Sequence, residues 1–319
     1  MFGMRLRAAT LLLIGVLALS GCAGSGGGDS RVSTGLPPAG GGGTLAYALP
    51  ELPTTIDPLA ARTRAELTVA RQVYEPLIER LSGPYAEAAP QAGLALEARP
   101  SRDRTTWTVT LRPNVRFQDG TPFNADAVLA NSRRWQSDPA GQKLLPYLFA
   151  VDAPRPDEVR FLLERPAPDM VRRLSSPRLG IVSPRALDPQ SGQGARFLAD
   201  AAGSGTGAFE SGPSGPGRLM LSRFPGWWGS PIGLGPSLDG VTFVLGPQQG
   251  QRLRLLQDGA VQVADPLGPG GLRAAASDPL LDTVRGSLSG IGLEGSVRGI
   301  DSAQAIPVLS SVWLTRLVG

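Results

Sequence analysis

Short strand-like and helix-like segments alternate along most of this 319-residue chain, and this alternation is the feature that most restricts its fold. Apolar runs typical of strands begin at Thr44–Leu49 and recur as far as 261–264. Helical periodicity lies between them, most plainly after Thr63 and Glu66, which have the spacing of a capping box. No segment repeats at a fixed period, which excludes solenoids and propellers. The sequence therefore predicts a mixed α/β fold.

Each expected element follows from the local pattern of apolar residues. The helix that begins after Thr63 is expected to continue to Leu81, with a kink at Pro76. Asn124 is a suitable N-cap for a helix over 125–135, and Asp119-Gly120 predicts a turn before it. Further helices are expected at 169–174 and 251–257, and strands at 44–49, 107–111 with a continuation at 115–117, 159–163, 218–221, 241–245, 261–264 and near 281–284.

Motifs in five stretches of the chain occur in an order that indicates a protein family. The first stretch contains Ile56-Asp57-Pro58 and then Val73-Tyr74-Glu75-Pro76-Leu77. A Gly-Thr-Gly loop and a Pro-Gly-Trp-Trp segment follow later in the chain. The five stretches are 42–81, 106–128, 205–209, 224–229 and 238–265. In this order they resemble the family 5 extracellular solute-binding proteins, which are the oligopeptide-, dipeptide- and nickel-binding components of ABC importers.

The resemblance implies the first lobe of a periplasmic-binding-protein-like fold of type II, the peptide-binding type, with mixed sheets and short helices. Members of this family hold a ligand between two lobes that close by a hinge motion. Only 54 residues follow Asp265, too few for a second lobe with its own core. We therefore expect one lobe over 44–319, in which 265–319 replaces the second lobe. The final apolar run at 306–318 could return to the sheet of that lobe.

The N-terminus has the pattern of an export signal. Arg5 and Arg7 precede a short apolar run, and Leu19-Ser20-Gly21-Cys22 resembles a bacterial lipobox, so 1–21 is expected to be a lipoprotein signal peptide and Cys22 the lipidated residue. The alternative is an ordinary secretory signal with a chance cysteine. Residues 22–43 are rich in Gly and Ser and are expected to form a flexible linker.

Composition excludes several classes of function. The 319 residues include no His and one Cys, so His-based triads, His-based metal sites and internal disulfides are impossible. The 31 basic and 27 acidic residues give a net charge of +4, and removal of Arg5 and Arg7 with the signal leaves 29 against 27, or +2. The basic residues form no stripe of the kind that nucleic-acid binding requires. We expect no enzyme activity, no cofactor, no metal and no nucleic-acid partner.

The candidate ligand-binding residues follow from the resemblance. They are Glu51 and Leu52 in the loop after the first strand, and the aromatic residues Tyr74, Trp135 and Trp228. Each has a structural alternative: Glu51 could be a solvated carboxylate, Tyr74 and Trp135 could belong to the core, and Trp228 could anchor its loop. The glycines of 205–207 are expected to allow a tight turn between strands rather than to hold a phosphate.

The function implied is that of a substrate-binding lipoprotein of a peptide importer. It would bind oligopeptides, weakly with one lobe, on the extracytoplasmic face of the cell membrane, with ABC permease subunits as partners and a lipid anchor in the membrane. The absence of His favours a peptide over a nickel complex. Two alternatives are a non-transport envelope lipoprotein that uses the same scaffold for protein interaction, and a degenerate remnant that binds nothing.

Overall fold

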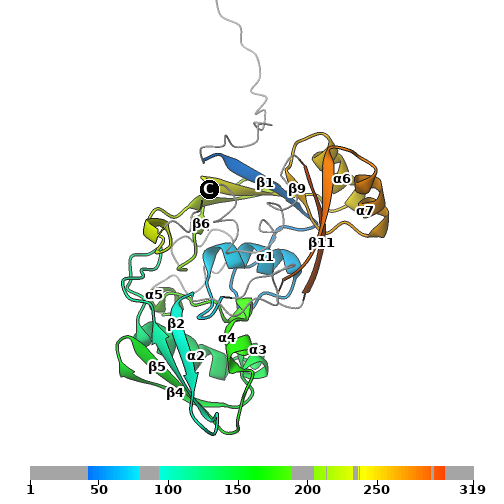
Figure 1. The fold of residues 1–319 in the computed structure, drawn as a ribbon. Coiled ribbons are helices and arrows are strands. Elements are labelled where there is room, and N and C mark those ends of the chain that lie inside the picture. Colours follow the sequence, from blue (N-terminus) through cyan, green and yellow to red (C-terminus); the bar gives the residue numbers. More distant parts are fainter. Residues whose placement is uncertain are drawn as a thin grey trace, which may run out of the picture. The chain divides into compact units, whose positions relative to one another are not determined.

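The larger of two sheets has seven strands, is mixed and contains the first strand of the chain (Figure 1). The computed structural model describes residues 42–79, 93–188, 205–212, 214–232, 236, 238–288 and 291–298. The strand order is β10-β11-β9-β1-β8-β7-β6. Strand β1 pairs in parallel with both β8 and β9, and the other pairs are antiparallel. The strands are β1 (Thr44–Leu49), β6 (Phe209–Ser211), β7 (Arg218–Arg223), β8 (Gly240–Leu245), β9 (Val263–Ala264), β10 (Leu281–Leu288) and β11 (Ile291–Arg298).

A second sheet is antiparallel throughout and has the order β2-β3-β5-β4. On β3 the side chains of Trp107, Val109 and Leu111 are buried and alternate with half-exposed threonines, as expected of a sheet with one face in a core. The strands are β2 (Ala95–Pro100), β3 (Thr106–Leu111), β4 (Leu148–Arg155) and β5 (Glu158–Leu163). The helices are α1 (Arg64–Val73), α2 (Ala125–Ser137), α3 (Pro139–Leu144), α4 (Met170–Leu174), α5 (Pro184–Leu187), α6 (Gln249–Gln257) and α7 (Pro269–Ala276), with 3-10 turns η2 (Pro177–Leu179) and η4 (Ser230–Ile232).

The buried side chains form three cores. The first core packs α1 against one face of the seven-stranded sheet, and the third core packs α6 and α7 against its other face. Strand β1 contributes to both, because its side chains alternate between the two faces. The second core fills the space between the four-stranded sheet and α2. Representative residues are Leu45, Tyr47, Val69 and Phe243 for the first core, Trp107, Val109, Val128 and Phe161 for the second, and Ala46, Ala48, Leu256 and Ala275 for the third.

Helix α1 begins where the sequence predicts and ends earlier than expected. The Thr63 side chain accepts a hydrogen bond from the Glu66 backbone, and the Glu66 side chain accepts one from the Thr63 backbone, so the capping box is confirmed. The helix ends at Val73, and Tyr74 has extended backbone angles. The expected continuation to Leu81 is therefore wrong. Pro76 has no N–H to donate within a helix, and it disfavours a helical conformation at Glu75, the residue before it.

Most of the other expected elements are confirmed, including α2 with its Asn124 cap, β8, β9 and the strand that begins at Leu281. The turn at Asp119-Gly120 is also present, with a φ of 82° at Gly120. The expected strand at 115–117 is wrong, because that segment makes only an isolated bridge between Arg116 and Pro122. The sequence patterns do not predict β2, β4, β6, β11, α3, α5 and α7. The run at 306–318 and residues 1–41 lie outside the described residues.

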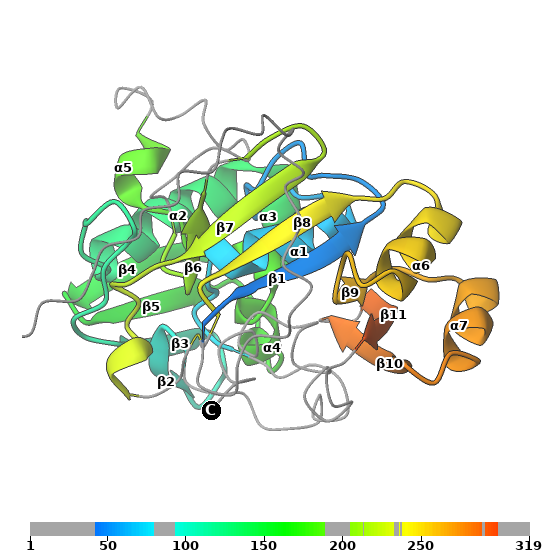
Figure 2. The ribbon, with the colours of Figure 1, turned by 90° about the horizontal axis from the view of Figure 1, so that it is seen from above.

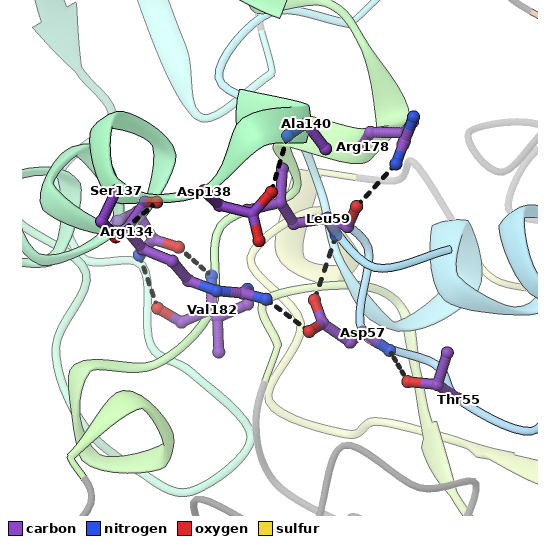
Figure 3. A network of polar contacts seen from close by, with 10 residues as sticks. Thr55, Asp57, Leu59, Arg134, Ser137, Asp138, Ala140, Arg178 and Val182 are labelled. Carbon is purple, nitrogen blue, oxygen red and sulfur yellow. Dashed lines mark hydrogen bonds and ion pairs between the residues drawn. The ribbon is translucent and has the colours of Figure 1, made fainter. Parts of the chain in front are cut away.

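The described chain passes between the first and second cores at four places, and a polar side chain binds at three of them. Asp57 lies between Ile56 of the first core and Leu59 of the second. Its carboxylate forms an ion pair with Arg134 of α2 and accepts a hydrogen bond from the Leu59 backbone (3.0 Å; Figure 3). We refer to Asp57, Glu75, Asn131 and their partners as the polar seam.

Asn131 of α2 binds the chain where it runs from Ile181 of the second core to Val182 of the first. The Asn131 amide donates to the Val182 carbonyl (2.7 Å) and accepts from the Val182 N–H (3.0 Å). Asn131 is fully buried, so both hydrogen bonds replace contacts with water that the amide has lost. This side chain therefore fixes the position of α2 relative to the chain that enters the first core.

Glu75 lies where the chain runs from Tyr74 of the first core to Leu77 of the second. Its two carboxylate oxygens accept hydrogen bonds from the indole N–H groups of Trp227 (3.0 Å) and Trp228 (2.9 Å). Enclosure of the carboxyl group raises the pKa of Glu75 to about 7, and the indole hydrogen bonds only partly oppose this effect. A titratable group thus lies where the two cores meet.

The Gly205-Thr206-Gly207 loop packs directly against the end of α1. The Gly207 N–H donates to the Val73 carbonyl (2.8 Å), and a Cβ on Gly205 would lie 1.9 Å from the same oxygen. Gln118 binds the loop through backbone and side-chain hydrogen bonds to Gly205. Neither glycine has a positive φ. The expectation that these glycines serve a tight turn is therefore wrong, because close backbone approach is what requires them.

The Glu75→Gln substitution should change how stability depends on pH. Between the usual glutamate pKa of 4.5 and about 7 the folded chain holds a proton on Glu75 that the unfolded chain releases. The Glu75 contribution to the free energy of unfolding therefore decreases as pH rises through this range. From pH 5 to pH 8, the free energy of unfolding measured in urea should fall by about 2 kcal/mol less for the variant than for the unsubstituted chain. The exposed Glu164→Gln provides the control, and a variant difference that stays constant with pH would contradict the prediction.

The Gly205→Ala substitution should destabilise the fold strongly, because the new methyl group would overlap the Val73 carbonyl. Overpacking of this kind should lower the free energy of unfolding by on the order of 3 kcal/mol, measured by thermal or urea unfolding. Gly215→Ala is the matched control, since a Cβ there meets nothing within 4 Å. Equal effects of the two substitutions would show that close approach is not the reason for glycine at 205.

Candidate functional site

The carboxyl ends of three parallel strands meet at one edge of the seven-stranded sheet. Strand β1 lies between β8 and β9, with Leu49 opposite Leu245 and Ala48 opposite Ala264. Figure 2 shows β1 and β8 side by side with their arrowheads at the same edge. We call the residues that follow these strands, 50–52, 246–248 and 265–267, the carboxyl edge. In open α/β sheets, ligands bind outside the carboxyl ends of the strands.

Two of the predicted ligand-binding residues lie at the carboxyl edge. Glu51 is exposed, and Leu52 is half-buried with its side chain against the first core. At the end of β8, Leu245 leaves 37% of its surface exposed. An exposed carboxylate beside partly exposed apolar side chains can bind an amine that is attached to an apolar group.

One acid at this edge, Asp265, follows β9 and is fully buried. One of its oxygens forms an ion pair with the Arg64 guanidinium (2.5 Å), and the other accepts a hydrogen bond from the Tyr47 hydroxyl (3.2 Å). Burial raises the pKa of Asp265 to about 6, although Arg64 and Tyr47 lower it. Burial also raises the pKa of Tyr47 above its usual value, so its hydroxyl stays protonated. Asp265 therefore orients both partners.

Arg252 joins the two loops that follow β8 and β9. From α6, its guanidinium donates to the carbonyls of Gly246 (2.5 Å) and Pro266 (2.7 Å). Asp265 also interacts with Arg252 electrostatically. Because Arg252 is 5% exposed, these bonds are shielded from water, and they fix the loops on either side of β1 relative to each other.

The predicted aromatic residues do not lie at the carboxyl edge. Tyr74 belongs to the first core and Trp135 to the second, and each is 1% exposed. Trp228 is half-buried and contacts both cores. Its indole N–H binds Glu75, and the Arg112 guanidinium lies 4.0 Å from its ring centroid. The structure therefore supports the alternatives in which Tyr74 and Trp135 fill cores and Trp228 anchors its loop.

Neither Arg64 nor Asp265 is a candidate from the sequence alone, yet the fold brings the two together across 201 residues. Asp265 ends the last family stretch, and Arg64 lies inside the capping box, so each appeared only as part of another pattern. A buried acid paired with a distant Arg leaves no local signal, because the pairing depends on which strands are neighbours. Within the described ranges, no cluster of three or more potential metal ligands occurs.

Cys22 and the expected signal peptide and linker lie outside the described residues. In the part of the chain that the structure describes, no helix combines the length and the apolar character needed to cross a membrane.

The known proteins to which this chain is similar include glutathione-binding proteins. Glutathione-binding protein GsiB of Escherichia coli (strain K12) is 32% identical over 219 residues, which are 67% of this chain and 40% of that protein. This chain therefore spans less than half the length of the curated relatives that it matches. The relatives are binding proteins, which confirms the expectation that the chain is not an enzyme.

Solved structures confirm the predicted fold class. The binding protein DppA from Helicobacter pylori, in complex with the peptide STSA, has a TM-score of 0.67 at 18% identity, covering 77% of this chain and 51% of that one. A dipeptide-binding protein from Pseudoalteromonas sp. SM9913, in complex with Met-Leu, has a TM-score of 0.66 at 18% identity, covering 76% and 51%. The fold is thus that of periplasmic binding proteins.

The model of one family, described as "Bacterial extracellular solute-binding proteins, family 5 Middle", matches residues 89–298. This match covers most of the described chain and includes the four-stranded sheet and the strands β6 to β11. The chain belongs to the family 5 bacterial extracellular solute-binding proteins.

Proposed function

We propose that this protein is a substrate-binding component of an ABC importer and that it takes a peptide-type ligand at the carboxyl edge. The observation that carries the proposal is the exposed Glu51 carboxylate at the carboxyl ends of three parallel strands. Glu51 would bind the ligand amine, and Leu52 would contact its apolar part. The glutathione-binding and peptide-binding relatives support a small peptide as the ligand class.

The location proposed is the extracytoplasmic face of the cell membrane. Cys22 would carry the lipid anchor, and residues 22–43 would connect it to the folded part. Permease subunits of the importer would receive the ligand from this position. The family description as extracellular supports the side of the membrane, and the lipobox-like sequence supports the anchor.

Binding can be tested by calorimetric titration of the full chain with glutathione, with the peptide STSA and with Met-Leu. At least one probe should bind with a Kd in the micromolar range. Glu51→Gln should weaken that binding roughly 10- to 100-fold, because a charge-assisted hydrogen bond contributes about 1.5–3 kcal/mol. N-acetylation of the probe should have a similar effect.

The control for this experiment is Glu164→Gln, which removes an exposed carboxylate in the loop after β5 and should leave the Kd unchanged. If none of the three probes binds at millimolar concentration, the proposed function is wrong. Such a result would favour the scaffold or the remnant interpretation.

Lipid anchoring can be tested separately with Cys22→Ser. In cells labelled with a palmitate analogue, the unsubstituted chain should carry the label and remain with the membrane fraction. The variant should lose the label entirely and leave the membrane after a wash, since acyl chains supply about 0.8 kcal/mol of membrane affinity per methylene group. Ser30→Ala is a control within the expected linker. A labelled Cys22→Ser chain would overturn the assignment of Cys22.

A further inference from the structure

Trp228 lies across the junction of the first and second cores and is held from two directions. Its side chain is half-buried and packs against both cores. Its indole N–H donates to Glu75 (2.9 Å), and the Arg112 guanidinium lies 4.0 Å from its ring centroid. A guanidinium over an indole is attracted by the negative face of the ring. Glu75 and Arg112 together therefore keep this ring against the two cores.

Two charged groups act on Glu75, and each has a partner of its own. Glu79 raises the pKa of Glu75, and it forms a buried ion pair with Arg71 of α1 (3.0 Å). Arg112, which follows β3, interacts with Glu75 electrostatically and donates to the Gly93 carbonyl (2.8 Å). These partners fix both groups in place, so neither needs to move when Glu75 gains or loses a proton.

The hydrogen bonds to the Glu75 carboxyl group come from the neutral indoles of Trp227 and Trp228. They favour the ionised form, but enclosure opposes it more strongly, so the pKa is about 7 rather than 4.5. A carboxylate that water reached would have a pKa near the usual value. Ionisation of Glu75 therefore favours any local state that admits water to this group.

The two indoles differ in how firmly they are held. Trp227 is 4% exposed and belongs to the first core, and a Cβ on Gly229 would lie 2.3 Å from its ring. Trp228 is only half-buried, and the turn η4 that follows it, Ser230–Ile232, is exposed along its length. Of the two donors to Glu75, Trp228 is thus the one that can leave without opening a core.

We propose that Glu75 is a proton-dependent latch: while protonated it keeps Trp228 across the junction of the two cores, and its ionisation releases Trp228 so that water reaches the carboxylate. Release removes a side chain that contacts both cores, so it loosens the contact between them. The latch is built from this chain alone and is independent of the proposed function and of any ligand.

The sign and the pH range follow from linkage. The closed state has the raised pKa of about 7, and the open state has the usual 4.5, so the closed state is favoured most at low pH. The ratio of open to closed molecules should rise between these two values and level off above them. From pH 5 to pH 8 the rise should be roughly 50- to 100-fold.

A purely structural role of Glu75 is the competing explanation, and it predicts the opposite response. An ionised carboxylate is a stronger acceptor than a neutral carboxyl group. If the junction stays closed, the indole hydrogen bonds should therefore strengthen as pH rises, and Trp228 should become more protected from solvent.

The test is solvent exchange of the indole N–H groups, measured by NMR on the full chain at pH 5 and pH 8. Trp228→Phe and Trp227→Phe identify the two signals, and exchange is compared with that of N-acetyl-tryptophanamide at the same pH. Relative to this reference, exchange at Trp228 should increase roughly 50- to 100-fold from pH 5 to pH 8. Exchange at Trp227 should increase much less. In Glu75→Gln the relative exchange at Trp228 should stay constant, whereas the exposed Glu164→Gln should keep the full increase.

Urea separates the latch from unfolding of the whole chain. Release of Trp228 exposes little surface, so its exchange should not change in 1 M urea, whereas exchange at Trp135, which is 1% exposed in the second core, should increase. A common response of Trp228 and Trp135 to urea would overturn the proposal. Relative exchange at Trp228 that stays constant or slows from pH 5 to pH 8 would overturn it too, and this result requires only the unsubstituted chain and the Trp228→Phe assignment.

Discussion

The polar seam between the first and second cores is the constraint on which the arrangement of the two sheets depends. Apolar packing is not directional and would allow the cores to slide against each other. Asp57, Glu75 and Asn131 bind partners in specific geometries, so a displaced arrangement would leave polar groups without partners. Each lost partner costs about 1–3 kcal/mol. The seam therefore selects one orientation, and it places a titratable group, Glu75, at the contact.

The position of β1 at the centre of three parallel strands has a comparable effect on the proposed site. Because β8 and β9 run in the same direction as β1, the loops that follow all three strands reach one edge. Glu51 and Asp265, which are 214 residues apart in the sequence, therefore lie on neighbouring loops. The buried Asp265 would be costly alone, and the Arg64 ion pair and the Tyr47 hydrogen bond offset that cost.

Local signals predicted elements well where the physical cause is local. The start of α1 follows from the Thr63 and Glu66 capping box, and α2 follows from Asn124 and the apolar spacing after it. The end of α1 was misplaced because the apolar periodicity continues past Pro76, although the backbone cannot. Strand β2 was missed because its side chains are mostly exposed and show no regular alternation. Its place in the sheet comes from its hydrogen bonds to β3.

The sequence by itself determined the fold class, the family and the placing of Glu51 and Leu52 after the first strand, because these depend on patterns that are contiguous in the chain. The tertiary structure decided which side chains share a site. In the structure, Tyr74 and Trp135 lie in cores, Trp228 donates a hydrogen bond to Glu75, and Arg64 forms an ion pair with Asp265. These contacts join residues 153 and 201 positions apart, and only the order and direction of the strands bring such residues together.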